Sequence, residues 1–214
     1  MRGQSESLIL IDKVIDIINS PVMFFQSITG ENLNTLFEIH NSRWTIEEGW
    51  LTGFNPDESA GMAIFKQDFP GNILMEFECR TVKPSSNDIN FMWNGEWSDE
   101  LNSCKNAMIG SICGWHLNRI GIEKSPDYKI RVTVPNNSFS PGKTYKIRAG
   151  SVNNTSFIFI DGKPALEVDD PDPIDKHKYT KVAFTAWSSH IQIKNIVIRQ
   201  ISWKPQELSY LPEI

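Results

Sequence analysis

Cysteine and tyrosine are scarce in this chain of 214 residues, with three and four copies. Long apolar runs are also missing: no stretch reaches the ~18 residues that a membrane-spanning helix needs, which predicts a soluble protein without a membrane partner. The cysteines, Cys79, Cys104 and Cys113, lack the spacing of a metal site. They fit free thiols in a reducing compartment, or one disulfide with one thiol left over.

Several catalytic and cofactor motifs are absent as well. The sequence has no phosphate-binding loop, no dinucleotide fingerprint and no serine-centred nucleophile elbow. The net charge of −5 argues against nucleic acid as a partner. Residues 1–20 contain Asp12, Lys13 and Asp16 within their apolar stretch, so they do not form a secretory signal. We therefore expect a cytoplasmic protein, or a periplasmic or secreted one if an upstream leader has been removed.

Apolar and aromatic residues are plentiful: 40% of the chain is apolar, with seven tryptophans and twelve phenylalanines. Residues 8–18 have helical spacing, although a strand over residues 8–11 is an alternative, and residues 32–37 form a second helical candidate. The remaining chain predicts short strands separated by turns, typical of an all-β sandwich or barrel. The expected strands are 44–47, 50–53, 62–67, 73–82, 88–93, 108–115, 119–123, 129–134, 144–149, 156–160, 165–168, 181–187 and 191–201.

Two turns in the second half of the chain can be predicted from their residue types. Asp161-Gly162 lies between two β-like runs and predicts a type I′ hairpin. Residues 140–143, Ser-Pro-Gly-Lys, predict a further turn before a strand. Because no linker or low-complexity tract divides the chain, we expect one domain over residues 44–203, with an N-terminal helical or edge segment (1–43) packed on it and a C-terminal tail (204–214).

The order of these elements resembles a known superfamily. The runs 140–148, 157–164, 181–184 and 191–198 resemble the C-terminal half of a concanavalin A-like jelly roll. Residues 68–78, 115–117 and 165–170 are similar to the YesU-like family, small intracellular jelly-roll proteins found with pectin and rhamnogalacturonan utilisation genes. The resemblance covers most of residues 44–201. It implies a two-sheet antiparallel jelly roll that binds or processes carbohydrate.

Alternation along the strands sorts side chains between the core and the surface. On residues 73–80 it places Ile73, Met75, Phe77 and Cys79 inward, and on the next strand Ile89, Phe91 and Trp93. If these two strands are neighbours in the concave sheet, a polar sugar-binding groove follows. Its expected lining consists of Glu76, Glu78, Arg80, Asn90 and Asn94.

Two alternative catalytic sites emerge. Glu76 and Glu78 resemble the acids of retaining glucanases and could act as nucleophile and proton donor, although Arg80 stands where a third acid would follow. Alternatively, both are ion-paired surface residues. His116 and Arg119 could act as base and carboxylate binder in a polysaccharide lyase, or His116 is structural. His40, His177 and His190 have no partners at metal-ligand spacing.

The tryptophans divide by position. Trp93, Trp97 and Trp187 are candidates for a sugar platform, with core packing as the alternative. We expect Trp44, Trp50, Trp115 and Trp203 to pack in the core or at its edge. The acidic loop 169–175 could hold a structural calcium but fits a solvated turn better, so no metal or cofactor is assigned. The prediction is therefore an oligosaccharide-binding jelly roll, with a glycoside hydrolase, a lyase or a non-catalytic accessory module as alternatives, and an undetermined oligomeric state.

Overall fold

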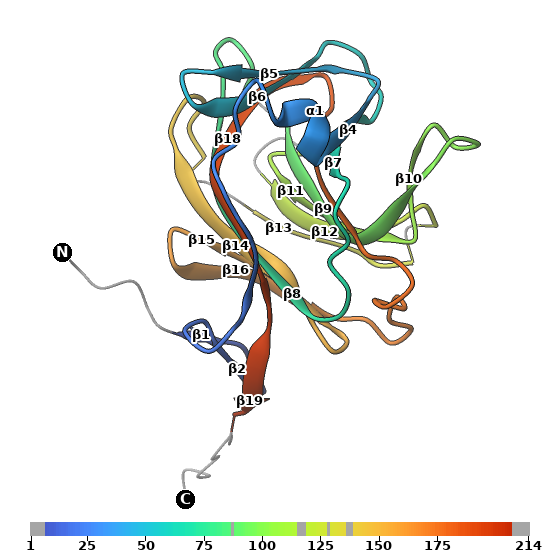
Figure 1. The fold of residues 1–214 in the computed structure, drawn as a ribbon. Coiled ribbons are helices and arrows are strands. Elements are labelled where there is room, and N and C mark those ends of the chain that lie inside the picture. Colours follow the sequence, from blue (N-terminus) through green and yellow to red (C-terminus); the bar gives the residue numbers. More distant parts are fainter. Residues whose placement is uncertain (1–6, 87, 115–118, 128, 136–138, 207–214) are drawn as a thin grey trace, which may run out of the picture.

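The computed structural model describes residues 7–86, 88–114, 119–127, 129–135 and 139–206. In these residues, antiparallel strands form two eight-stranded sheets and one three-stranded sheet (Figure 1). The front sheet contains, in spatial order, β13 (Arg131–Pro135), β12 (Arg119–Ser125), β11 (Ala107–Ile112), β9 (Ile89–Ser98), β17 (Lys181–Ala186), β7 (Gly61–Phe65) and β4 (Phe37–His40), with β10 (Ser103–Lys105) paired to β9.

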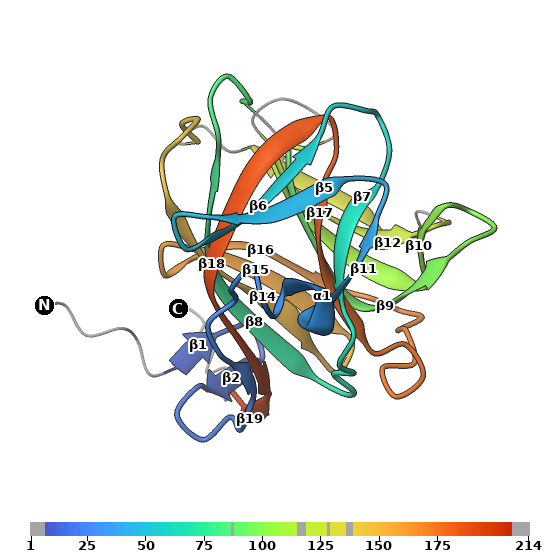
Figure 2. The same cartoon turned by 45° about the horizontal axis from the view of Figure 1, so that its top comes forward.

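The back sheet lies opposite the front sheet and encloses the main core with it (Figure 2). Its order is β16 (Lys163–Asp169), β15 (Thr155–Ile160), β14 (Tyr145–Val152), β8 (Ile73–Thr81), β18 (Ser189–Gln200), β6 (Trp50–Asn55) and β5 (Arg43–Glu47), with β3 (Val22–Phe25) paired to β18. The only helix in the described residues is the single turn α1 (Leu33–Leu36). No helix there is long and apolar enough to cross a membrane.

Phenylalanine rings from both sheets meet in the core. Phe77 of β8 contacts Phe91 of β9 and Phe184 of β17 edge to face, with ring centroids 5.2 and 5.1 Å apart. The inward sets predicted by alternation on β8 and β9 are confirmed, since all seven residues are buried. Cys79, Cys104 and Cys113 are buried and form no disulfide, in agreement with the first of the two alternatives.

The helix predicted over residues 8–18 is wrong. These residues form β1 (Ser7–Ile9) and β2 (Lys13–Asp16), which join β19 (Ser202–Pro205) in the three-stranded sheet at one end of the sandwich (Figure 1). Leu8 and Ile15 are buried there against Leu74, Phe157 and Phe159 on the outer side of the back sheet. The hairpin of β1 and β2 covers this apolar patch, and the apolar spacing alone does not distinguish a hairpin from a helix.

The structure places the predicted Asp161-Gly162 turn and parts of both terminal segments. Asp161 and Gly162 have φ angles of 50° and 79°, as the predicted type I′ turn requires. The N-terminal residues contribute more than a packed segment, because β3 and β4 are strands of the two large sheets. At the other end, β19 extends to Pro205, so the expected tail begins within a strand.

Candidate functional site

Polar side chains form a row across the outer face of the front sheet. Asn90 of β9 is paired with Ser111 of β11 on one side and with Thr185 of β17 on the other. Ser111 is paired in turn with Gly121 of β12. These side chains point away from the core, yet Asn90, Ser111 and Thr185 are only 8%, 0% and 6% exposed. We call the row and the two carboxylates beside it the front polar site.

The two carboxylates belong to Asp88 and Glu123, and both are buried. Asp88 lies just before β9, where its Oδ1 accepts a hydrogen bond from Ser111 Oγ at 3.2 Å. Burial raises the pKa of Asp88 to about 6, against the opposing effect of hydrogen bonds from Asn90 and Ser111. Burial raises the pKa of Glu123 to about 7, and the charge of Asp88 adds to this while Arg131 opposes it. Both groups therefore exchange protons near neutral pH.

Two buried polar atoms of the front polar site have no hydrogen-bond partner among the described residues. They are Glu123 Oε2 and Thr185 Oγ1. Leaving such atoms unpaired costs roughly 1–3 kcal/mol each, so proteins rarely retain them without a reason. A ligand with hydroxyl groups can satisfy both atoms, because a hydroxyl donates and accepts.

Arginines border the site on β12 and β13. Arg119 and Glu123 lie on the same face of β12, and Gly121 between them has no side chain to fill the gap. Arg119 donates to Thr133 Oγ1 at 3.3 Å, while Arg131 is paired with Glu123 across the sheet. Guanidinium groups at these positions can bind a carboxylate of a ligand in a bidentate manner.

Trp187 lies beside the Asp88 end of the site. Its backbone N–H donates to Ser189 Oγ at 3.1 Å, and that hydroxyl donates to the Asp88 carbonyl oxygen at 3.1 Å. Trp187 is 40% exposed, so the indole is accessible, as a platform requires. Trp97 differs: it packs against buried residues of the front sheet and stacks on His40, with ring centroids 3.9 Å apart. Its platform role stays a prediction.

Gly114 follows β11 and packs directly on the site. A Cβ at this position would lie 1.9 Å from Ser111 Oγ and 2.4 Å from Asp88 Oδ1. Any side chain here would displace both polar groups. Glycine therefore allows the Asp88–Ser111 hydrogen bond to form beneath this segment.

The predicted common groove is wrong. It required β8 and β9 to be neighbours, but β8 lies in the back sheet between β14 and β18, whereas β9 lies in the front sheet. Outward side chains of the two strands therefore point to opposite sides of the sandwich. Glu76, Glu78 and Arg80 are separated from Asn90 by the whole core.

Glu76 is fully engaged on the back sheet. Its Oε2 accepts from Arg148 Nε and its Oε1 from Arg199 Nε, both at 2.8 Å. Glu78 forms a longer ion pair with Lys194, at 3.5 Å. This arrangement corresponds to the ion-paired alternative, while catalysis by Glu76 and Glu78 stays a prediction that the geometry does not favour.

Arg80 and Trp50 pack together on the same outer face. The Arg80 guanidinium lies 4.3 Å from the centroid of the Trp50 ring, and the Lys194 ammonium lies 4.1 Å from it. Arg80 Nε also donates to Gln192 Oε1 at 2.7 Å. Trp50 therefore packs beneath cations rather than in the core, whereas Trp44 is buried in the main core.

Trp93 and Asn94 are not surface residues. Trp93 is 0% exposed and donates from Nε1 to Ser151 Oγ at 2.5 Å, so its predicted platform role is wrong. Asn94 is also 0% exposed, has a φ of 48°, and donates from Nδ2 to the Gly71 carbonyl oxygen. The register between β9 and β17 shifts beside it, which breaks the alternation that predicted a groove position.

Of the lyase pair, Arg119 lies at the front polar site, and His116 lies outside the described residues, as does Trp115. Sequence reasoning missed Asp88, Glu123 and Thr185 as site residues. A signal for Glu123 was present, since alternation from Arg119 places it on the same face. What the sequence could not indicate is its burial.

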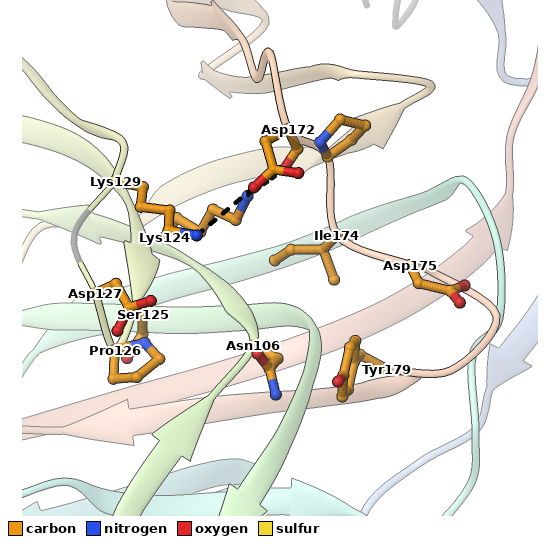
Figure 3. A pocket seen from close by; sticks show the side chains of 11 residues that line it. Asn106, Lys124, Ser125, Pro126, Asp127, Lys129, Asp172, Ile174, Asp175 and Tyr179 are labelled. Carbon is orange, nitrogen blue, oxygen red and sulfur yellow. Dashed lines mark hydrogen bonds and ion pairs between the residues drawn. The ribbon is translucent and has the colours of Figure 1, made fainter.

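The acidic loop after β16 contacts lysines (Figure 3). Lys124 of β12 lies 3.1 Å from Asp170 and 3.7 Å from Asp172, and Lys129 also contacts Asp172 at 3.7 Å. Lys124 thus links the front sheet to the loop that leaves the back sheet. No group of three metal-ligating residues occurs in the part of the chain that the structure describes, and a structural calcium stays an untested expectation.

No protein-family model and no curated protein sequence matches the chain. Solved structures do share its architecture. Carbohydrate-binding module CBM66 from Bacillus subtilis aligns with a TM-score of 0.61 at 10% identity, over 82% of this chain and 99% of the module. The chain has a two-sheet antiparallel jelly-roll fold.

Two further jelly rolls of this kind support the assignment. A Bacillus subtilis protein of unknown function with a galectin-like fold has a TM-score of 0.67 at 10% identity, over 85% of this chain and 96% of that one. Bacillus licheniformis β-glucanase has a TM-score of 0.57 at 11% identity, over 85% and 99%. At these identities the similarity establishes the fold alone.

Proposed function

We propose that the front polar site binds an oligosaccharide. The observation that supports this most directly is the pair of buried, unpartnered atoms, Glu123 Oε2 and Thr185 Oγ1, within a row of polar side chains. Sugar hydroxyls can bond to both atoms, and the exposed Trp187 can pack against a C–H face of the ring. A carbohydrate-binding module and a β-glucanase among the proteins with this fold agree with a carbohydrate ligand.

Arg119 and Arg131 favour a sugar that carries a carboxylate. Guanidinium groups recognise carboxylates through paired charge-assisted hydrogen bonds. The resemblance to the YesU-like family points in the same direction, towards pectic or rhamnogalacturonan fragments. We therefore propose uronate-containing plant oligosaccharides as the ligand class.

Glycoside hydrolysis at the front polar site is a second candidate function. The specific observation is that Glu123 and Asp88 both have raised pKa values, about 7 and about 6. A carboxyl group that stays protonated near neutral pH can act as a general acid, and a second carboxylate can act as base or nucleophile. Glu123 would donate the proton and Asp88 would take the second role.

Isothermal titration with pectic and glucan oligosaccharides tests binding. We expect Glu123→Gln and Thr185→Val to weaken affinity for a pectic fragment roughly tenfold each, the effect of about one lost hydrogen bond in a buried site. Glu78→Gln, on the opposite sheet, serves as the matched control and should leave affinity unchanged. Absence of binding at millimolar ligand, or equal losses in all three variants, would exclude this site.

Product analysis separates binding from chemistry. A hydrolase releases new reducing ends, whereas a lyase forms an unsaturated uronate that absorbs in the near ultraviolet. If hydrolysis occurs, Glu123→Gln and Asp88→Asn should both abolish it while Glu78→Gln retains it. Ultraviolet-absorbing products would instead support the lyase alternative with His116 and Arg119.

A further inference from the structure

A separate cavity of about 240 Å³ lies on the outer face of the back sheet, remote from the front polar site. Strands β5 and β6 and the beginning of β18 form its floor. Its size suits a single sugar ring rather than a long ligand. The lining residues are Arg43, Thr45, Glu47, Thr52, Phe54 and His190.

An aromatic ring lies at the centre of this cavity. Phe54 is paired with Arg43 of β5 on one side and with His190 of β18 on the other, so the three side chains stand in one cross-strand row. Phe54 is 45% exposed although it is apolar. Its ring contacts the His190 imidazole edge to face, with centroids 5.4 Å apart. An exposed ring between two basic side chains offers both a stacking surface and hydrogen-bond donors.

Arg43 has no hydrogen bond or ion pair within the described residues, unlike its neighbours on this face. There, Arg148 and Arg199 share Glu76, Lys194 contacts Glu78, and Arg80 bonds to Gln192. The guanidinium of Arg43 is thus available to an anion from outside the chain. A carboxylate is the natural partner for its planar donor geometry.

The next row of the sheet supplies fixed polar groups. Thr45 Oγ1 donates to Glu47 Oε1 at 2.9 Å, which orients the carboxylate and leaves Oε2 without a hydrogen-bond partner among the described residues. Thr52 Oγ1 accepts from Gln192 Nε2 at 3.2 Å. These hydroxyl and carboxylate groups can bond to sugar hydroxyls without rearranging, which lowers the entropic cost of binding.

We propose that this cavity is a second carbohydrate site, specific for a sugar ring that bears a carboxylate. The apolar face of the ring packs on Phe54, Arg43 pairs with the carboxylate, and Glu47 accepts a ring hydroxyl. The inference is independent of the front polar site, because the two lie on opposite sheets and share no residue.

Backbone amide NMR with oligogalacturonate as the probe tests this inference. We expect chemical-shift changes at residues 43–54 and at His190, saturating separately from changes around Asn90 and Glu123. Arg43→Gln should weaken binding at this site about tenfold or more, and Phe54→Ala should weaken it similarly. Lys146→Gln removes an exposed cation of the same face outside the cavity and should have no effect.

The methyl ester of the same oligosaccharide completes the design. Wild-type protein should bind it at the back cavity about tenfold more weakly, and Arg43→Gln should bind acid and ester equally. Shifts confined to the front sheet would overturn the second site while leaving the first intact. Shifts at the back cavity that are equal for acid and ester would overturn the specificity for a carboxylate.

Discussion

Replacing Glu123 by glutamine removes a buried carboxyl group whose ionisation opposes folding. Burial raises its pKa from 4.5 to about 7. Between these values the folded protein holds the proton more tightly than the unfolded chain does. The free energy of unfolding therefore falls as the pH rises through this interval, and the loss is complete above the folded-state pKa.

The size of the effect follows from the pKa difference. Each pH unit corresponds to about 1.36 kcal/mol, so ionised Glu123 costs the folded state at most about 3 kcal/mol. Solvent screening of a carboxylate near the surface reduces this to about 1–2 kcal/mol. We expect Glu123→Gln to be more stable than wild type by that amount at about pH 8, and equally stable within about 0.5 kcal/mol at about pH 4.5.

Urea unfolding followed by tryptophan fluorescence measures both values. Asp88 also has a raised pKa, but it is present in both proteins, so the difference between them isolates Glu123. Glu100→Gln replaces an exposed carboxylate and serves as the control, with no pH-dependent gain. If the wild-type and Glu123→Gln curves run parallel from pH 4.5 to 8, Glu123 is not a destabilising buried acid, and the argument for the front polar site fails.

Three further predictions address individual contacts. Glu76→Gln, which breaks the ion pairs with two arginines, should lower the free energy of unfolding by about 2 kcal/mol in urea, whereas Glu78→Gln should change it by less than about 1 kcal/mol. Gly114→Ala should cost about 2–3 kcal/mol in the same assay, because its methyl group overlaps the polar groups beneath it; an unchanged midpoint would refute that packing. Trp187→Ala should weaken sugar binding about tenfold in calorimetry with a stability change within about 0.5 kcal/mol. Trp203 on β19 is similarly exposed, and Trp203→Ala should not weaken binding.

Alternation along a strand was a reliable guide to which side chains enter the core. On β8 and β9 every residue that it placed inward is buried, although several outward residues, such as Asn90 and Met92, are buried as well. It could not say which sheet each strand joins, because that depends on pairing between distant segments. β8 pairs with β18, so residue Gln192 lies beside Arg80, more than a hundred residues earlier in the chain. The predicted site therefore combined residues from opposite faces.

The N-terminal hairpin illustrates a second limit. Leu8 and Leu10 are buried while Ile9 and Ile11 are exposed, which is the period of a strand. The apolar residues further along the segment also fit helical spacing, and local sequence alone gives no reason to prefer one. Tertiary packing selects the hairpin, because its apolar side chains bury Leu74 and Phe157 on the outer side of the back sheet.

Burial distinguishes the two glutamates that matter most here. Glu76 looked catalytic in the sequence, yet two arginines hold both of its oxygens, so its charge stabilises the back sheet. The predicted site residues do not include Glu123, yet it is buried and its Oε2 has no hydrogen-bond partner among the described residues. A carboxylate of the second kind lowers stability, and under the proposed function a ligand supplies its missing partner. A buried carboxylate that destabilises the fold, such as Glu123, is therefore a better indicator of a functional site than two acids close together in the sequence, such as Glu76 and Glu78.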